Sequence, residues 1–276
     1  MMTTMKRLST LFLSLMLTLT LVTLFPISVL AASFELSTSA RTAFDKMAAS
    51  ANSSSANLMN NQYANILKLQ QQDQEWDNKI KDLHYLNEET LIVVKKKIQL
   101  VDSDKLTNLQ AKLTQARERY KPLFSMYESL NQQKAVAKKL NHKEIYNLLL
   151  SQTESMKIAV QLARTDIRNK ESSYTTAKSK TAATKKLLRA TLDGIAPLKV
   201  QIKVSKNAAS MTQKKFITET LTLKQSIKNG NISTTLRSLD ALVTHAKKVI
   251  EHKEKTYLLE QKISEIERKV QLQLAS

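Results

Sequence analysis

The chain has 276 residues, with 43 Lys plus Arg against 24 Asp plus Glu, a formal net charge of +19, no Cys, two Gly and three Pro. Sheets need tight turns, and tight turns need residues such as glycine, which tolerates a positive φ, or proline, whose ring fixes φ. Gly194 and Gly230 are the only glycines, which argues against sandwiches, barrels and wound α/β folds and excludes glycine-rich nucleotide-binding loops. We therefore expect an all-α fold and no cofactor.

Residues 1–31 have the pattern of an export signal peptide. Lys6 and Arg7 precede an apolar stretch that ends at Pro26, and Ala31 stands where a signal peptidase reads small residues. We predict cleavage near Ala31, which lowers the net charge from +19 to +17 and leaves a secreted or wall-associated protein of bacterial type. An uncleaved anchor stays open, because 18 mostly apolar residues can just span a bilayer.

Two segments follow the signal peptide. Residues 32–57 are small and polar, and we expect a loosely structured segment in which Phe44 and Met47 could form a short helix. From Leu58 onward, apolar residues at steps of three and four predict a helix over 58–101. Asp102, Ser103 and Asp104 then supply the polar side chains that cap the start of another helix.

The next predicted helix, 103–140, carries the most regular apolar pattern in the chain. Its steps of 3, 4, 3, 4, 3, 4 and 3 are those of a heptad seam, which is typical of knobs-into-holes packing. Pro122 falls within the seam, so we expect a bend there and no helix end. The seam consists of Leu106, Leu109, Leu113, Ala116, Tyr120, Leu123, Tyr127 and Leu130.

Three more helices are predicted over 142–193, 197–229 and 233–274. Gly194 followed by Pro197 indicates a helix stop and restart, and we expect the chain to reverse there, as it should again around Gly230. Short reversals favour antiparallel neighbours. We thus predict an elongated antiparallel helical bundle, or coiled coil, of about five long helices over 58–276, with a self-associating coiled coil as the alternative.

No pattern in the sequence indicates catalysis or metal binding. His84, His142, His245 and His252 are too far apart in sequence for a helical metal site. The carboxylates around Trp76 fit a solvated helix face better than an acid–base pair. Since no nucleophile motif occurs either, we expect no catalytic residue, no metal, no small-molecule substrate and no enzyme activity.

The charge distribution is the most informative feature. Residues 172–228 carry twelve cations against only Asp193 and Glu219, and across the chain Lys outnumbers Arg by 34 to 9. Lysine suits diffuse contact with phosphates better than base reading, so sequence-specific nucleic-acid binding is not expected. A purely solubilising face is the competing interpretation. The predicted polyanion-binding residues are Lys178, Lys180, Lys185, Lys186, Arg189, Lys199, Lys203, Lys206, Lys214 and Lys215.

These observations predict an exported, non-catalytic coiled-coil protein of the cell surface or extracellular space. It would bind an anionic polymer (a wall polyanion, lipid headgroups or nucleic acid) through a Lys-rich hairpin turning at Gly194. Two alternatives stay open. One is a membrane-active helical bundle resembling a pore former, and the other is a coiled-coil partner or holdase for exported proteins.

Overall fold

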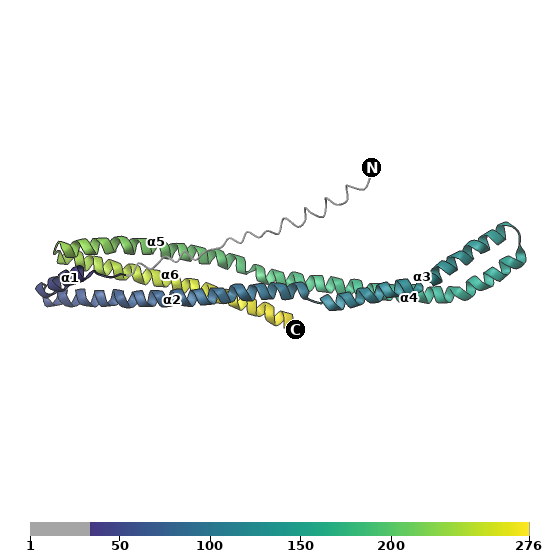
Figure 1. Ribbon diagram of the computed structural model, residues 1–276, viewed down its shortest axis with the longest axis horizontal. Coiled ribbons are helices and arrows are strands. Elements are labelled where there is room, and N and C mark those ends of the chain that lie inside the picture. The colour runs from purple at the N-terminus through teal and green to yellow at the C-terminus, as the bar shows by residue number, and fades with distance from the viewer. Residues whose placement is uncertain (1–33, 276) are drawn as a thin grey trace, which may run out of the picture. The chain divides into compact units, whose positions relative to one another are not determined.

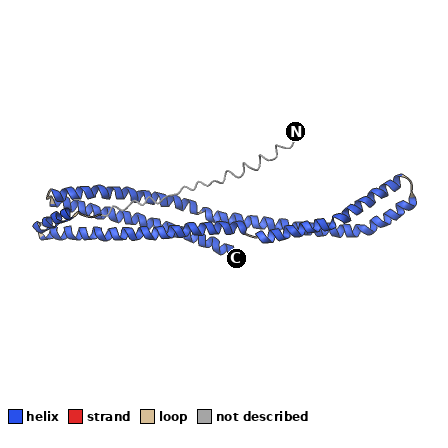
Figure 2. Ribbon diagram, in the orientation of Figure 1, coloured by secondary structure: helices blue, strands red, loops and turns tan. Residues whose placement is uncertain are grey.

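The computed structural model describes residues 34–275, and this part of the chain is helical with no strand (Figures 1 and 2). The all-α prediction is therefore confirmed, with six helices in place of the predicted five or so. No described helix is long and apolar enough to cross a membrane. The signal peptide predicted for residues 1–31 lies outside the described residues. The helices are α1 (Thr38–Ser50), α2 (Ser53–Leu100), α3 (Ser103–Lys139), α4 (Lys143–Asp193), α5 (Ile195–Lys228) and α6 (Ile232–Ala275).

The described residues form two compact units. The first unit consists of residues 34–75 and 207–251, and the second of residues 76–206 and 252–275. Helices α2, α5 and α6 each contribute residues to both units, whereas α1 belongs to the first and α3 and α4 belong to the second. Each unit is described by itself below.

In the first unit, α1 and the residues before it are well packed. Phe34 and Phe44 are buried, and their rings lie 5.7 Å and 5.5 Å from the ring of Tyr63 on α2. Phe34 also lies edge-on to Phe216 of α5, at 6.1 Å. These contacts correct the expectation of a loosely structured segment over 32–57, because aromatic side chains from distant parts of the chain order its residues 38–50 as a helix.

In the second unit, α3 and α4 form an antiparallel helical hairpin. Arg117 pairs with Glu171 at 2.9 Å, and Lys134 donates to Thr153 at 3.1 Å, so residue numbers rise on α3 as they fall on α4. Helix α3 continues through Pro122 without interruption. All eight seam residues predicted between Leu106 and Leu130 are buried or half-buried, whereas most residues between them are exposed.

The chain does not reverse at Gly194. Its φ and ψ are −61° and −16°, which are ordinary right-handed helical values. Lys185 before it contacts Gln99 of α2, and Lys199 after it contacts Glu88, so α4 and α5 proceed along α2 in one direction. The prediction of a hairpin at Gly194 is therefore wrong.

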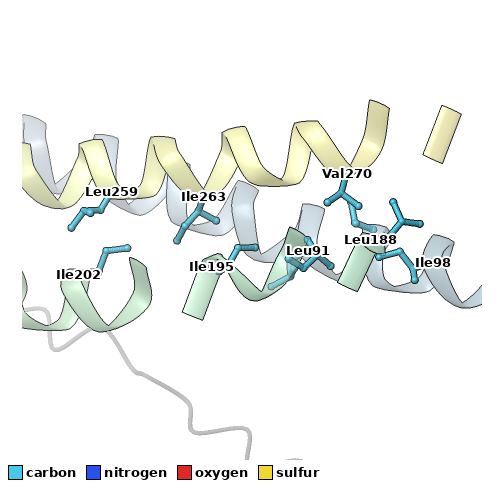
Figure 3. Close-up of a cluster of buried hydrophobic side chains, with 10 residues drawn as sticks. Leu91, Ile98, Leu188, Ile195, Ile202, Leu259, Ile263 and Val270 are labelled. Atoms are coloured by element: carbon cyan, nitrogen blue, oxygen red, sulfur yellow. The ribbon is translucent and has the colours of Figure 1, made fainter. Parts of the chain in front are cut away.

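A continuous apolar stripe accounts for this direction. Leu188, Ile195 and Ile202 are seven residues apart, and all three belong to one buried cluster with side chains of α2 and α6 (Figure 3). Because the stripe continues across Gly194, burial of its side chains keeps the backbone helical. Gly194 also leaves room for a neighbour, since a Cβ built on it would lie 3.3 Å from Ile266 Cδ1.

The remaining helix, α6, runs parallel to α2 in the second unit. Asp77 pairs with Lys253 at 2.8 Å and His84 contacts Glu260 at 3.0 Å, so residue numbers rise together on the two helices. The expectation that neighbouring helices are antiparallel holds for α3 with α4 but not here. When three helical segments pack around one core, at least two of them must point the same way.

Alanine substitutions at the two glycines test whether the helical chain continues in one direction through Gly194. Gly230 has a φ of +67° at the turn between α5 and α6, so we expect Gly230→Ala to cost about 1 kcal/mol of unfolding free energy. Gly194→Ala should instead be close to neutral, because alanine favours the helical backbone already present there while its Cβ has to displace Ile266 Cδ1 slightly. Urea unfolding followed by circular dichroism measures both, and equal losses would contradict the continuous path.

Candidate polyanion-binding flank

The predicted cations have a defined position relative to the buried stripe of α4 and α5. Thr181, Leu188, Ile195 and Ile202 are buried at intervals of seven and mark the face toward the core. Of the predicted cations up to residue 206, seven lie one residue after, or two or three residues before, a position of this seven-residue repeat. On a helix these positions are all on one side of the core face, and we call the seven cations the basic flank. The basic flank consists of Lys178, Lys185, Lys186, Arg189, Lys199, Lys203 and Lys206.

Two members of the basic flank serve internal contacts. Lys185 is half-buried, and its Nζ donates to the carbonyl oxygen of Gln99 at 2.8 Å. Lys199 forms an ion pair with Glu88 of α2. These two lysines therefore help to hold α4 and α5 against α2, which is a structural task that the sequence did not reveal.

The other five members are exposed, and one of them, Lys206, helps by its charge to lower the pKa of Glu260. Lys178, Lys186, Arg189 and Lys203 form no ion pair with any residue that the structure describes, and Lys178 lies over the ring of Tyr174 at 5.9 Å. Their positions extend over 25 residues of helical chain, or about 37 Å at 1.5 Å per residue. They form a row of positive charges along one side of the helical path.

The other predicted cations are placed differently. Lys180 directly precedes buried Thr181, so it lies on the opposite side of the core face from the basic flank. Lys214 and Lys215 are exposed but belong to the first unit. The single patch predicted for residues 172–228 is thus divided between two sides of the helix and two compact units.

The second unit contains a buried polar network that the sequence did not predict. The carboxylate of Glu260, almost fully buried, accepts from Asn87 Nδ2 at 2.9 Å and lies 3.0 Å from His84 Nδ1. Ser264 Oγ in turn donates to Oδ1, the amide oxygen of Asn87, at 2.5 Å. Burial raises the pKa of Glu260, but the hydrogen bonds from His84 and Asn87 outweigh it, so the net pKa is lowered and the carboxylate is ionised.

Glu267 lies seven residues further along α6 in a less favourable setting. Its side chain is 2% exposed, and its Oε1 has no hydrogen-bond partner among residues 34–275. Burial, and then repulsion from Glu88 on α2 and Glu260 on α6, raise its pKa to about 7, with partial relief from Lys199 on α5. The sequence contains a pattern that indicates burial of both carboxylates. Glu260 and Glu267 alternate with Ile263 and Val270 at steps of three and four, so the four residues share one helix face.

The other residues considered for chemistry have structural contacts. Trp76 packs edge-on against Tyr257 at 5.5 Å, and Asp77 pairs with Lys253. Within residues 34–275 no group of three or more His, Asp or Glu side chains is arranged to hold a metal ion. Trp76 and Asp77 thus each have a partner on α6.

Comparison with known proteins gives no similarity on which to base a function. No protein-family model matches the chain, and no curated protein or solved structure matches it. The functional conclusion therefore depends on the basic flank and on the sequence itself.

The raised pKa of Glu267 predicts a specific pH dependence of stability. The folded chain binds this proton more tightly than the unfolded chain does, so the contribution of Glu267 to stability is lost as the pH rises from about 4.5 to above 7. We expect Glu267→Gln to stabilise the protein on the order of 2 kcal/mol at pH 8 and much less at pH 5. Urea unfolding at both pH values measures this, and an equal difference at pH 5 and pH 8 would contradict it.

Proposed function

We propose that this chain is an exported, non-catalytic helical protein that binds a wall polyanion through the basic flank. The observation that carries the proposal is the row of exposed cations Lys178, Lys186, Arg189 and Lys203. Asp193 is the only acidic residue in the segment 172–206, so little negative charge offsets this row. The pattern of residues 1–31 supports export, and it places such a protein where wall polymers are found.

The shape of the charge distribution favours an extended polymer over a compact anion. A row of about 37 Å can meet successive charges of a chain-like polyanion, and each neutralised charge releases counterions. A small anion would need several donors converging in one pocket. The basic flank is mostly lysine, whose ammonium group is a point charge and does not select one planar group. We therefore expect an affinity that depends on the charge density of the polymer and falls steeply as the salt concentration rises.

The test is co-sedimentation of the mature chain, beginning at Ala32, with purified bacterial cell walls at low and high salt. Reversing the four exposed charges should reduce retention at low salt by more than about tenfold, because the polymer then meets repulsion along the row. Retention of the unchanged protein should disappear at high salt. The variant carries Lys178→Glu, Lys186→Glu, Arg189→Glu and Lys203→Glu.

A matched control separates the basic flank from net charge. Four exposed lysines of the first unit can be reversed, so that the net charge falls by the same amount while the flank is unchanged. We expect this control to retain most of its binding. Equal losses in both variants would show that only total charge matters and would contradict the proposed site. The control carries Lys46→Glu, Lys68→Glu, Lys247→Glu and Lys248→Glu.

A further inference from the structure

The loop end of the α3–α4 hairpin carries large apolar side chains in contact with water. Val136 and Leu140 near the end of α3 are 56% and 62% exposed, and Ile145 and Leu148 at the start of α4 are 50% and 60% exposed. Figure 1 shows the two helices joined by a short loop there. Exposed apolar clusters of this kind mark interaction surfaces, because their contact with water is unfavourable.

These side chains lie on one face of the hairpin. Val136, Leu140 and Ile145 line a groove of about 450 Å³ between α3 and α4, with Leu149 among its walls. Leu148 is one helical turn from Ile145, so the apolar surface continues beyond the groove. We call these five residues and the loop between the helices the hairpin tip.

The charge around the hairpin tip restricts the partner. Residues 129–149 contain four lysines and one acidic residue, Glu144. Lys134 is held internally by Thr153, whereas Lys138, Lys139 and Lys143 are exposed on either side of the loop. Apolar side chains bordered by long cationic ones match the boundary between lipid headgroups and acyl chains, where lysines reach the headgroups while apolar groups enter the hydrocarbon.

We propose that the hairpin tip is a docking surface for an anionic lipid bilayer, with Leu140 and Ile145 entering the headgroup boundary and the three exposed lysines contacting the lipid charges. The contact is shallow, because the apolar surface is confined to the tip. It is separate from the basic flank and does not depend on wall binding. Each lysine near an anionic surface strengthens binding by about fivefold at low salt.

A single fluorescent label tests the contact directly. The chain contains no Cys, so Leu140→Cys can carry one environment-sensitive dye on the full mature protein. Vesicles of phosphatidylcholine with one-quarter phosphatidylglycerol should shift its emission to the blue, and pure phosphatidylcholine should shift it little. A dye at Thr114→Cys, an exposed position on α3 away from the tip, should not respond. No shift at position 140, or equal shifts at both positions, overturns the proposal.

Partition onto the same vesicles distinguishes apolar insertion from charge attraction. Leu140→Asp with Ile145→Asp should weaken partition by more than about tenfold, because two apolar side chains lose their burial. Ile158→Asp with Leu162→Asp removes two apolar side chains elsewhere on α4 that are at least as exposed and adds the same charge, so it serves as the control. Equal losses in the two variants would contradict insertion of the tip.

The same partition measurement tests the three exposed lysines when their charges are reversed. Lys138→Glu, Lys139→Glu and Lys143→Glu together should reduce partition by about a hundredfold at low salt. The control reverses three exposed lysines of α2 at positions 95–97 and should lose far less. Retained partition in the tip variant would overturn the proposal. Since the basic flank is unchanged in the tip variant, its wall binding reports on the proposed function separately.

Discussion

The structure of the second unit depends on one apolar stripe that passes through Gly194 without interruption. Leu188, Ile195 and Ile202 face the same core on both sides of the glycine, and that core includes side chains of α2 and α6. A reversal at Gly194 would remove Ile195 and Ile202 from that core. The stripe therefore fixes the direction of α5, and with it the position of every cation that follows.

The basic flank is a consequence of this packing. Lysines next to a buried stripe can extend their apolar stems along the core boundary and keep their charges in water. Lys185 and Lys199 use this position to bind α2, while Arg189 and Lys203, each one residue after a buried member of the stripe, remain free of ion pairs among residues 34–275. One heptad pattern thus supplies both the internal contacts and the exposed charge.

Burial of the two carboxylates of α6 costs free energy of folding, and burial of the apolar stripe has to offset that cost. Glu260 is matched by His84 and Asn87, and a shift of α6 by three residues would place the apolar Ile263 opposite the Asn87 amide. An unmatched buried amide is unfavourable, so the network favours one register of α6 against α2. Glu267 has no such partner for its Oε1, and it weakens the unit once it is ionised.

Much of the local structure could be predicted from the sequence, because helix ends and heptad seams are local patterns. The predicted ends fall within two residues of the observed ones, apart from the start of α2 at Ser53 in place of Leu58. The path at Gly194 could not be predicted, since a glycine followed by a proline fits both a helix end and a helix that continues. The packing of Phe34, which precedes α1, involves Phe216, a residue far away in sequence. The internal roles of Lys185 and Lys199 require knowledge of which helix lies beside them.

The central structural claim is that α4 and α5 continue in one direction, so that the cations form a row and not a compact hairpin patch. Spin labels at Thr184→Cys and Val204→Cys test it, because both positions are exposed and the chain has no other Cys. They are equally far from Gly194 in sequence. A continuous path predicts a backbone separation of about 30 Å. A separation of about 10 Å, typical of two helices packed side by side, would contradict it.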